Sequence, residues 1–385
     1  MIRRTFLGGA VAGLTLAGCG RSPPPAVPEG VTLTPIGGYF PLQSRALLAL
    51  VGVKGVPARH AVDCYQVVYG SRDSAGAPIR LSGLLALPRG VPALGLASWQ
   101  HGTTTSRQDV PSTLASEGMA AAILFAGNGY ATVAADYIGL GVSPLTHTYY
   151  AVDDTARAAI DLIDVARRLP GVPDSPPFLA GFSQGGHATL AVQQTLEAAD
   201  RPVLGSAAVA GAFNLRTISF GEALKGQAAQ ASLYLAYLAR GMGARYGHPL
   251  ETVMTGPMAA LTRKLYDQPH TPDEIIATLP KDPRALFDPG FLDAFDHDRP
   301  HWFLEAMAAN EVSHFTPRAP VRLFHGAGDI DVSPRESTVT AGMFQARGAD
   351  AQAIDLGPVD HGGSALKAAP AVLDWLGSLG KTTWR

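Results

Sequence analysis

A serine between glycines has the residue types and spacing of an enzyme nucleophile. Residues 181–185 read Gly-Phe-Ser-Gln-Gly, which places Ser183 at the centre of a G-x-S-x-G pattern. An apolar run at 178–180 predicts a short buried strand before it, and apolar residues recur at helical spacing over 188–199. Such a tight strand-to-helix turn lifts the serine hydroxyl out at the edge of a sheet. We therefore expect the Ser183 hydroxyl to attack a carbonyl carbon, with the first amides of the helix aimed at the carbonyl oxygen.

Catalysis by a serine also needs a base and an acid, and the second half of the chain offers both. Residues 360–363 read Asp-His-Gly-Gly after an apolar run that predicts the last strand. His361 suits the general base because imidazole titrates near neutral pH. Asp329 and Asp331 follow another apolar run and are alternative acids, which would orient the base and stabilise its protonated form. The order Ser, Asp, His along the chain is typical of hydrolases with this serine turn.

The hydrophobic pattern predicts a scaffold that brings these side chains together. Short apolar runs alternate with amphipathic runs, which indicates a mostly parallel sheet with helices on both faces, preceded by an antiparallel pair of strands. The carboxyl ends of parallel strands share one edge of the sheet, where we expect the three side chains to meet. Strands are expected at 64–70, 79–87, 93–100, 130–135, 178–180, 203–210, 321–324 and 351–356, and helices at 114–126, 153–169 and 364–379.

A long insertion separates the strand at 203–210 from the strand at 321–324. It spans about a hundred residues, whereas connections in compact domains usually take about two to six. Helical runs at 228–240 and 287–307 predict a helical cap over the serine turn. Six large apolar residues of this segment either line a pocket for an acyl chain or form the cap's own core: Met242, Met254, Met258, Phe291, Phe295 and Trp302.

Three motifs together resemble the α/β-hydrolases of the secretory-lipase type and the bacterial serine esterases and lipases. They are Gln-His-Gly-Thr at 100–103, Gly-Tyr at 129–130 with Asp-Tyr-Ile-Gly-Leu-Gly at 136–141, and Gly-Phe-Ser-Gln-Gly-Gly-His at 181–187. The resemblance implies an α/β-hydrolase fold, in which a mostly parallel central sheet has helices on both faces and a helical cap is inserted after the sixth strand.

The resemblance also implies a division of the chain and the roles of its site residues. The core is expected at 36–213 and 318–385, with the cap at 214–317. In this family the residue after a His-Gly pair, here Thr103, donates its backbone N–H to the oxyanion. Gln184, directly after the nucleophile, donates the second backbone N–H.

Two of these assignments have a neighbouring rival. Thr104 is an alternative to Thr103 as the oxyanion donor. The family places the acid after a His-Gly turn and three residues before a valine, which favours Asp329 over Asp331. Asp136 is expected to brace its loop and not to act as the acid.

The resulting prediction is a serine hydrolase that cleaves carboxylic esters, an esterase or lipase, through Ser183, His361 and Asp329 and an acyl-enzyme. Its substrate would be a small-molecule or lipid ester, without a metal or cofactor. The histidines and aspartates at 296–301 could suggest a metal site, but Pro300 breaks the helix that would align them. Two alternatives stay open: a peptidase or acyltransferase with the same triad, and a catalytically silent lipoprotein that binds lipid. The sequence does not indicate an oligomeric state.

The N-terminus reads as an export signal. Residues 1–18 carry paired arginines and an apolar run, similar to a twin-arginine signal peptide. Leu-Ala-Gly-Cys at 16–19 resembles a bacterial lipobox, in which Cys19 receives lipid and becomes the mature N-terminus. The proline-rich segment 19–35 would then be a tether, and Cys64 would have no partner for a disulfide. We expect an exported lipoprotein held at a membrane by its lipid anchor, in the periplasm or at the cell surface.

The composition fits a globular body behind this tether. The 385 residues are 46% hydrophobic and 16% charged, which is typical of a chain with a large buried core. The formal net charge of -2 leaves no overall basic character, so nucleic acid is not an expected partner.

Overall fold

The computed structural model describes residues 27–267 and 269–383. The predicted signal peptide at 1–18, the lipidation site Cys19 and the tether before residue 27 lie outside these described residues.

The first strand, β1 (Thr32–Tyr39), corrects the predicted tether. The tether was expected to run to residue 35, but the strand begins at Thr32 and pairs antiparallel with the next strand, with Thr32 opposite Val68. The register shifts between Pro35 and Gly37. Proline and glycine disfavour a strand in sequence patterns, yet both are tolerated on an edge strand and at a bulge.

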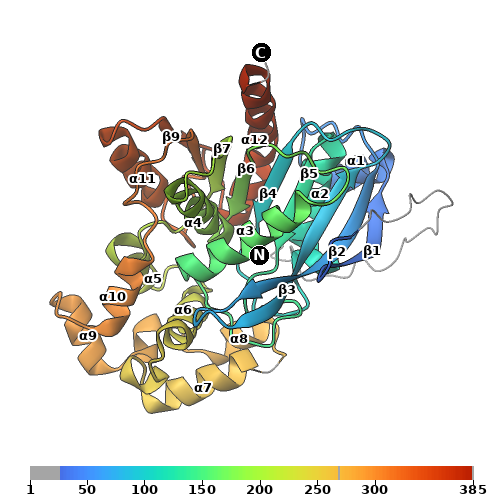
Figure 1. The fold of residues 1–385 in the computed structure, drawn as a ribbon. Coiled ribbons are helices and arrows are strands. Elements are labelled where there is room, and N and C mark those ends of the chain that lie inside the picture. The colour runs from blue at the N-terminus through green and yellow to red at the C-terminus, as the bar shows by residue number, and fades with distance from the viewer. Residues whose placement is uncertain (1–26, 268, 384–385) are drawn as a thin grey trace.

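The strands form one nine-stranded sheet in the order β1-β2-β3-β5-β4-β6-β7-β8-β9 (Figure 1). The ladders that join β1, β2, β3 and β5 are antiparallel, and those that join β5, β4, β6, β7, β8 and β9 are parallel. The remaining strands are β2 (Val62–Arg72), β3 (Pro78–Pro88), β4 (Leu96–Gln100), β5 (Ala131–Ala135), β6 (Phe178–Phe182), β7 (Gly205–Val209), β8 (Val321–His325) and β9 (Ala351–Asp355).

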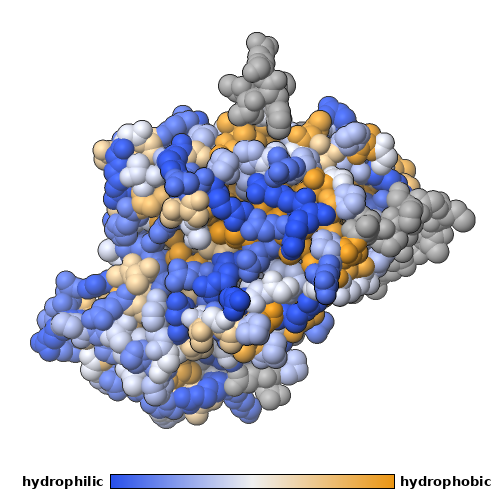
Figure 2. All heavy atoms as spheres, in the orientation of Figure 1, coloured by the Kyte–Doolittle hydropathy of each residue, from blue (hydrophilic) through white to orange (hydrophobic). Residues whose placement is uncertain are grey.

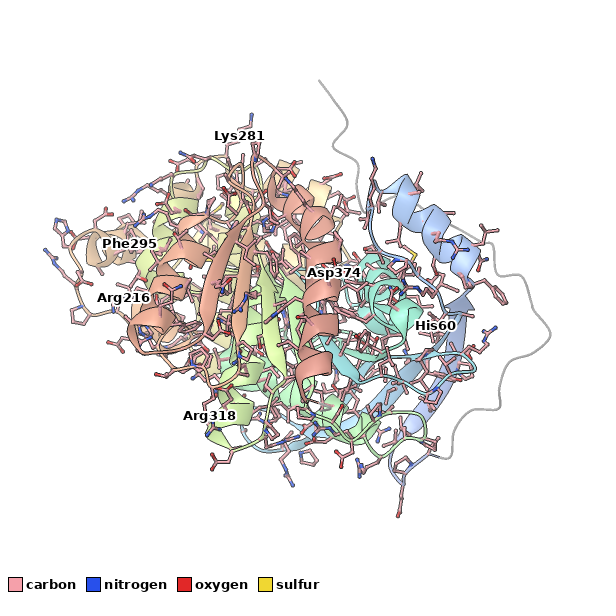
Figure 3. The ribbon with its side chains drawn as sticks, turned by 90° about the horizontal axis from the view of Figure 1, so that it is seen from above. His60, Arg216, Lys281, Phe295, Arg318 and Asp374 are labelled. Carbon is pink, nitrogen blue, oxygen red and sulfur yellow. The ribbon has the colours of Figure 1, made fainter. Side chains whose placement is uncertain are left out.

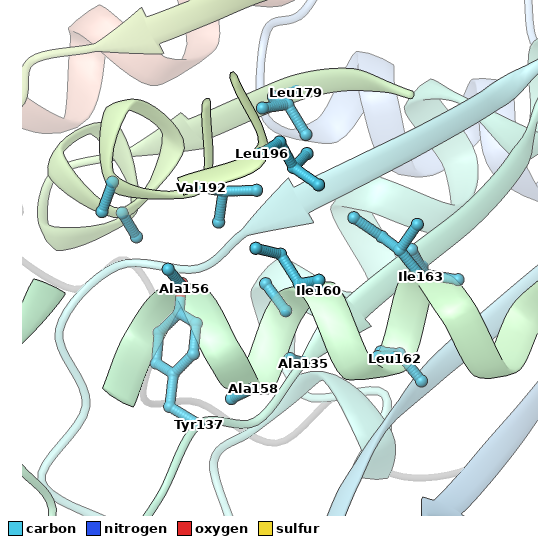
Figure 4. Packing of buried hydrophobic residues seen from close by; sticks show 14 of the residues in the cluster. Ala135, Tyr137, Ala156, Ala158, Ile160, Leu162, Ile163, Leu179, Val192 and Leu196 are labelled. Atoms are coloured by element: carbon cyan, nitrogen blue, oxygen red, sulfur yellow. The ribbon is translucent and has the colours of Figure 1, made fainter. Parts of the chain in front are cut away.

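Apolar residues on both faces of the central strands explain why helices cover the sheet twice. Along β6, Leu179 packs into one core with Ile160 of α3 (Val152–Ala166) and Val192 of α4 (Gln184–Ala198), as Figure 4 shows. The neighbouring Phe178 faces the other way, into a core that includes Leu376 of α12 (His361–Thr383). The first face is also covered by α11 (Arg335–Ala346), and the second by α1 (Pro41–Leu50) and α2 (Ser116–Leu124). Figure 3 shows α12, labelled at Asp374, along the strands.

The insertion between β7 and β8 folds as helices with a core of their own. It follows the seventh strand and not the sixth, because β1 adds a strand that the prediction lacked. The ring of Phe220 contacts four other phenylalanine rings of this segment at centroid distances of 5.0–5.9 Å. Of the six candidate pocket residues, Met242, Met254 and Phe291 are buried in the same cluster. The other three, Met258, Phe295 and Trp302, are partly buried and pack against it. The cap helices are α5 (Phe220–Ala223), α6 (Ala231–Tyr246), α7 (Gly256–Asp267), α8 (Pro272–Thr278), α9 (Pro289–Asp296) and α10 (Trp302–Ala309).

A helix that spans a membrane needs a minimum length and a high hydropathy. Among residues 27–267 and 269–383, no helix is long and apolar enough to cross a bilayer. The face in Figure 2 mixes many hydrophilic residues with smaller apolar areas.

A buried histidine links the core to the residues at the end of the cap. His187 on α4 donates its Nε2–H to the backbone oxygen of Asn310, at 2.7 Å, and packs edge-on against Tyr150. Burial is the main cause that lowers the pKa of His187 to about 4. In the folded protein near pH 7, the imidazole of His187 is therefore neutral and donates this hydrogen bond.

Replacing this histidine is expected to change how stability depends on pH. The pKa of His187 falls from 6.5 in an exposed group to about 4 in the folded protein, so between these values the unfolded chain binds a proton that the folded protein does not. Its stabilising contribution is complete above pH 6.5 and is lost as the pH falls toward 4. Between pH 7 and pH 5 we expect wild type to lose about 2 kcal/mol more unfolding free energy than His187→Gln, which keeps a donor.

Urea denaturation at the two pH values measures this difference. The other histidines are present in both proteins, so their contributions cancel in the comparison. Equal losses in the two proteins would show that His187 does not titrate with a lowered pKa.

Candidate active site

Ser183 occupies a sharp turn between β6 and α4. Its backbone has φ 58° and ψ −121°, a conformation that residues with a side chain rarely adopt. A Cβ on Gly181 would lie 2.2 Å from the carbonyl oxygen of Gly185, and a Cβ on Gly185 would lie 1.9 Å from that of Gln100. Only glycine fits at both positions, so the two glycines of the motif allow α4 to start directly against the strands.

The structure brings Ser183, His361 and Asp329 together at the carboxyl ends of β6, β8 and β9. Ser183 Oγ lies 2.9 Å from His361 Nε2, and His361 Nδ1 lies 2.7 Å from Asp329 Oδ2. Because a carboxylate only accepts, Nδ1–H must donate to Asp329, and Nε2 is left to accept the Ser183 hydroxyl proton. Ser183 is 7% exposed and His361 is 9% exposed, so these hydrogen bonds form largely away from solvent.

Asp329 is fully partnered inside the loop after β8. Its Oδ1 accepts the backbone N–H groups of Asp331 and Val332, both at 2.9 Å, and its Oδ2 accepts from His361 and from His325 Nε2. Burial alone would raise the pKa of Asp329, but the hydrogen bonds from the two histidines and the backbone outweigh it and hold that pKa well below its usual range. Asp331 thus supports the Asp329 carboxylate through its amide.

His325 is a second histidine on the same carboxylate oxygen. Its Nε2 lies 3.1 Å from Asp329 Oδ2 and 3.1 Å from the carbonyl oxygen of Val332, and its Nδ1 lies 2.8 Å from Ser337 Oγ. Both neighbours of Nε2 are acceptors, so Nε2 carries the proton and Nδ1 accepts from the serine. His325 therefore helps to fix the carboxylate that faces His361.

The loop after β4 lies against the serine turn. A Cβ on Gly102 would come within 3.5 Å of Ser183 Cβ, so the backbone of this loop touches the turn directly. Thr103 Oγ1 is hydrogen-bonded to the hydroxyl of Tyr149 at 2.6 Å, which ties the next residue of the loop to the segment before α3. Gln184 is the first residue of α4, a position at which the amide has no partner inside its helix.

The side chain of Gln184 is held by a buried histidine. Gln184 Nε2 lies 3.0 Å from His147 Nε2, and His147 Nδ1 lies 2.7 Å from the carbonyl oxygen of Ile138. Nδ1 must donate to that carbonyl, so Nε2 accepts the amide N–H of Gln184. Burial lowers the pKa of His147 to about 4, which keeps the ring in the neutral form that this pattern requires.

A half-buried glutamate contacts the same loop. Both carboxylate oxygens of Glu117, in the first turn of α2, lie 3.0 Å from the backbone nitrogen of Gly102. Trp99 Nε1 donates to Glu117 Oε2 at 3.2 Å. Burial raises the pKa of Glu117 to about 7, against the opposing effect of these hydrogen bonds. The amide of Gly102 is thereby occupied and cannot point at a substrate.

Asp136, Cys64 and the candidate metal ligands at 296–301 lie outside the group formed by Ser183, His361 and Asp329. Asp136 is buried and accepts from Ser82 Oγ and from the backbone of Ser112, at 2.6 and 2.9 Å, as expected of a residue that braces its loop. In the part of the chain that the structure describes, no group of three or more histidine, cysteine or acidic side chains could hold a metal ion. Cys64 is a buried free cysteine, and burial raises the pKa of its thiol.

Comparisons with known proteins agree with this architecture. Neither a family model nor a curated protein sequence matches the chain. Among solved structures, a candidate hydrolase from Legionella pneumophila has a TM-score of 0.81 at 25% identity, over 91% of this chain and 97% of that one. The rice cell wall degrading esterase LipA from Xanthomonas oryzae has a TM-score of 0.79 at 23% identity, over 91% and 98%. Candida antarctica lipase A in its closed state has a TM-score of 0.64 at 15% identity, over 84% and 78%.

These similarities confirm the predicted fold class: the chain has the α/β-hydrolase fold with a mostly parallel central sheet. Its structural neighbours are hydrolases, esterases and lipases, which agrees with the family resemblance of its motifs.

Proposed function

We propose that the chain is a serine hydrolase that cleaves carboxylic esters, an esterase or lipase, with Ser183 as nucleophile, His361 as general base and Asp329 as acid. The observation that carries the proposal is the unbroken hydrogen-bonded chain from Ser183 Oγ through His361 to Asp329, at 2.9 and 2.7 Å. The esterases and lipases among the structural neighbours support the same reaction type.

In the proposed reaction, Ser183 Oγ attacks the ester carbonyl carbon while its proton passes to His361 Nε2. The carbonyl oxygen becomes an oxyanion that accepts from the backbone N–H groups of Thr103 and Gln184. The carbonyl then re-forms as the ester C–O bond breaks, and His361 gives the proton to the departing alkoxide. The alcohol leaves, and the acyl group stays on Ser183 as an acyl-enzyme. Water repeats the attack with His361 as base and releases the acid.

The surroundings of Asp329 suit this sequence of proton transfers. A pKa held well below its usual range keeps the carboxylate ionised throughout the working pH of the enzyme. The positive charge that forms on His361 therefore always meets a negative partner, while the proton stays on the imidazole.

Purified protein should hydrolyse p-nitrophenyl esters, and Ser183 should react with a fluorophosphonate probe. Nitroanilides of the same acyl groups test for a peptidase: faster turnover of the amide than of the ester would replace the esterase assignment. Lack of both turnover and labelling would favour a silent lipid-binding protein.

We further propose that the protein is exported and held at a membrane through lipid on Cys19, with an ester substrate as its small-molecule partner. The support is the lipobox-like sequence at 16–19. Metabolic labelling with palmitate, absent in Cys19→Ser, would test it.

A further inference from the structure

The proposed mechanism leaves one carboxylate next to the site without a role. Glu117 reaches from the first turn of α2 to the loop after β4, and its two oxygens share the backbone N–H of Gly102 at 3.0 Å. The indole N–H of Trp99, in β4, donates to the same carboxylate at 3.2 Å. Glu117 therefore connects α2, β4 and the loop at a single point.

Gly102 packs against both this carboxylate and the serine turn. A Cβ on Gly102 would meet Glu117 Oε1 at 2.8 Å, the carbonyl oxygen of Phe182 at 3.2 Å and Ser183 Cβ at 3.5 Å. Glu117 and the serine turn thus both lie within van der Waals reach of the place where a side chain on residue 102 would begin. The next peptide group carries the N–H of Thr103, so a shift of Gly102 toward the space left by a missing carboxylate would turn that N–H as well.

We propose that Glu117 is a positioning residue, which holds the N–H of Gly102 so that the next N–H along the backbone, that of Thr103, points at the oxyanion. The inference rests on the proposed ester hydrolysis and deepens it. A carboxylate is a suitable anchor because its hydrogen bonds to N–H groups are roughly twice as strong as neutral ones. Oxyanion donors lower the barrier only when they are fixed before charge develops, and a backbone loop needs an external anchor for that.

The electrostatics of the site agree with this role. Burial is the largest of the influences that together raise the pKa of Glu117 to about 7, and nearby Asp109 acts in the same direction as burial. The hydrogen bonds from Gly102 and Trp99 act in the opposite direction and favour the ionised carboxylate, which is the form that accepts the Gly102 N–H most strongly.

The experiment compares wild type with Glu117→Ala and Glu117→Gln on a p-nitrophenyl ester and on an alkyl trifluoromethyl ketone. The ketone forms a reversible hemiketal with the serine, whose oxyanion lies where that of the transition state lies. For Glu117→Ala we expect kcat to fall by about 10–10²-fold, with KM within about twofold of the wild-type value. The loss is smaller than the roughly 10²–10³-fold that follows complete removal of an oxyanion donor, because the Thr103 N–H is still present. The inhibition constant of the ketone should rise by the same factor as kcat/KM falls.

Glu117→Gln keeps one oxygen as an acceptor, so its kcat/KM and inhibition constant should change together by about three- to tenfold. This variant carries the test if Glu117→Ala does not fold. An unchanged inhibition constant in a folded variant, or a loss that appears only in KM, would overturn the inference.

Glu336 provides the matched control. It is a buried carboxylate in α11 that also accepts backbone N–H groups, those of Phe213 and Asn214 at 3.0 and 2.9 Å, but it holds the segment that leads into the cap. Glu336→Ala should lower the melting temperature without changing the ratio of the ketone inhibition constant to KM. A wild-type protein that neither hydrolyses esters nor reacts with fluorophosphonate would refute the proposed function itself, which is a different result from an insensitive Glu117.

Discussion

Ser183→Ala and His361→Ala are each expected to lower kcat for ester hydrolysis by about 10⁶-fold, as loss of the nucleophile or base does in other serine hydrolases. Without the serine Oγ no acyl-enzyme can form. Without His361, nothing at 2.9 Å takes the proton from that oxygen. Steady-state turnover of p-nitrophenyl esters measures both losses, and both variants should lose labelling by fluorophosphonate.

The double variant distinguishes a catalytic unit from two independent losses. Because the two groups perform a single proton transfer, Ser183→Ala/His361→Ala should be about as inactive as either single variant. Unfolding can be excluded with Ser183→Gly: a residue at φ 58° and ψ −121° is relieved of strain by glycine, so this variant should fold at least as well and remain inactive. Substantial activity in any of these variants would contradict the proposed mechanism.

The serine turn could be predicted because the residues that determine its geometry are consecutive in the sequence. A side chain at Gly181 or Gly185 would clash with main-chain oxygens close to the serine turn. The two glycines of the motif therefore indicate that the strand and the helix pack closely there. The sheet was predicted for a similar reason. Its central strands are apolar on both faces, as Phe178 and Leu179 show, and a doubly covered parallel sheet is what such runs require.

Residues that act through distant partners could not be predicted in this way. Glu117 meets Gly102 across 15 positions and His147 meets Gln184 across 37, and nothing in either segment marks the pairing. The missing first strand has another cause, since an edge strand with a bulge need not be apolar or regular. His325 did carry a signal, because it begins the His-Gly turn that leads to Asp329, but its hydrogen bond to that carboxylate depends on the folded loop.

The choice between the two aspartates of that loop gives the second large prediction. Asp329→Asn is expected to lower kcat by about 10⁴-fold, and Asp331→Asn by less than about threefold. The structure explains the difference by contact: Asp329 Oδ2 lies 2.7 Å from His361 Nδ1, while Asp331 offers Asp329 its backbone N–H, which the substitution keeps. Ester turnover of the two variants measures the effect, and the opposite ranking would make Asp331 the acid.

The size of the Asp329→Asn effect follows from which way the new amide must face. The backbone N–H groups of Asp331 and Val332 require an acceptor, so the asparagine oxygen should take the place of Oδ1. Its NH₂ group then replaces Oδ2 and faces His361 Nδ1 as a donor. His361 must accept there and carry its proton on Nε2, where it can no longer accept the proton of Ser183.

The same substitution should also lower stability, because His325 Nε2–H loses its acceptor on residue 329. The pKa of Asp329 is lower in the folded protein than in the unfolded chain, so its hydrogen bonds contribute their full stability to wild type at every pH above the pKa of an unfolded aspartate. Asp329→Asn should therefore be less stable than Asp331→Asn at pH 7, and the two unfolding free energies should converge as acid protonates Asp329 in the Asp331→Asn variant.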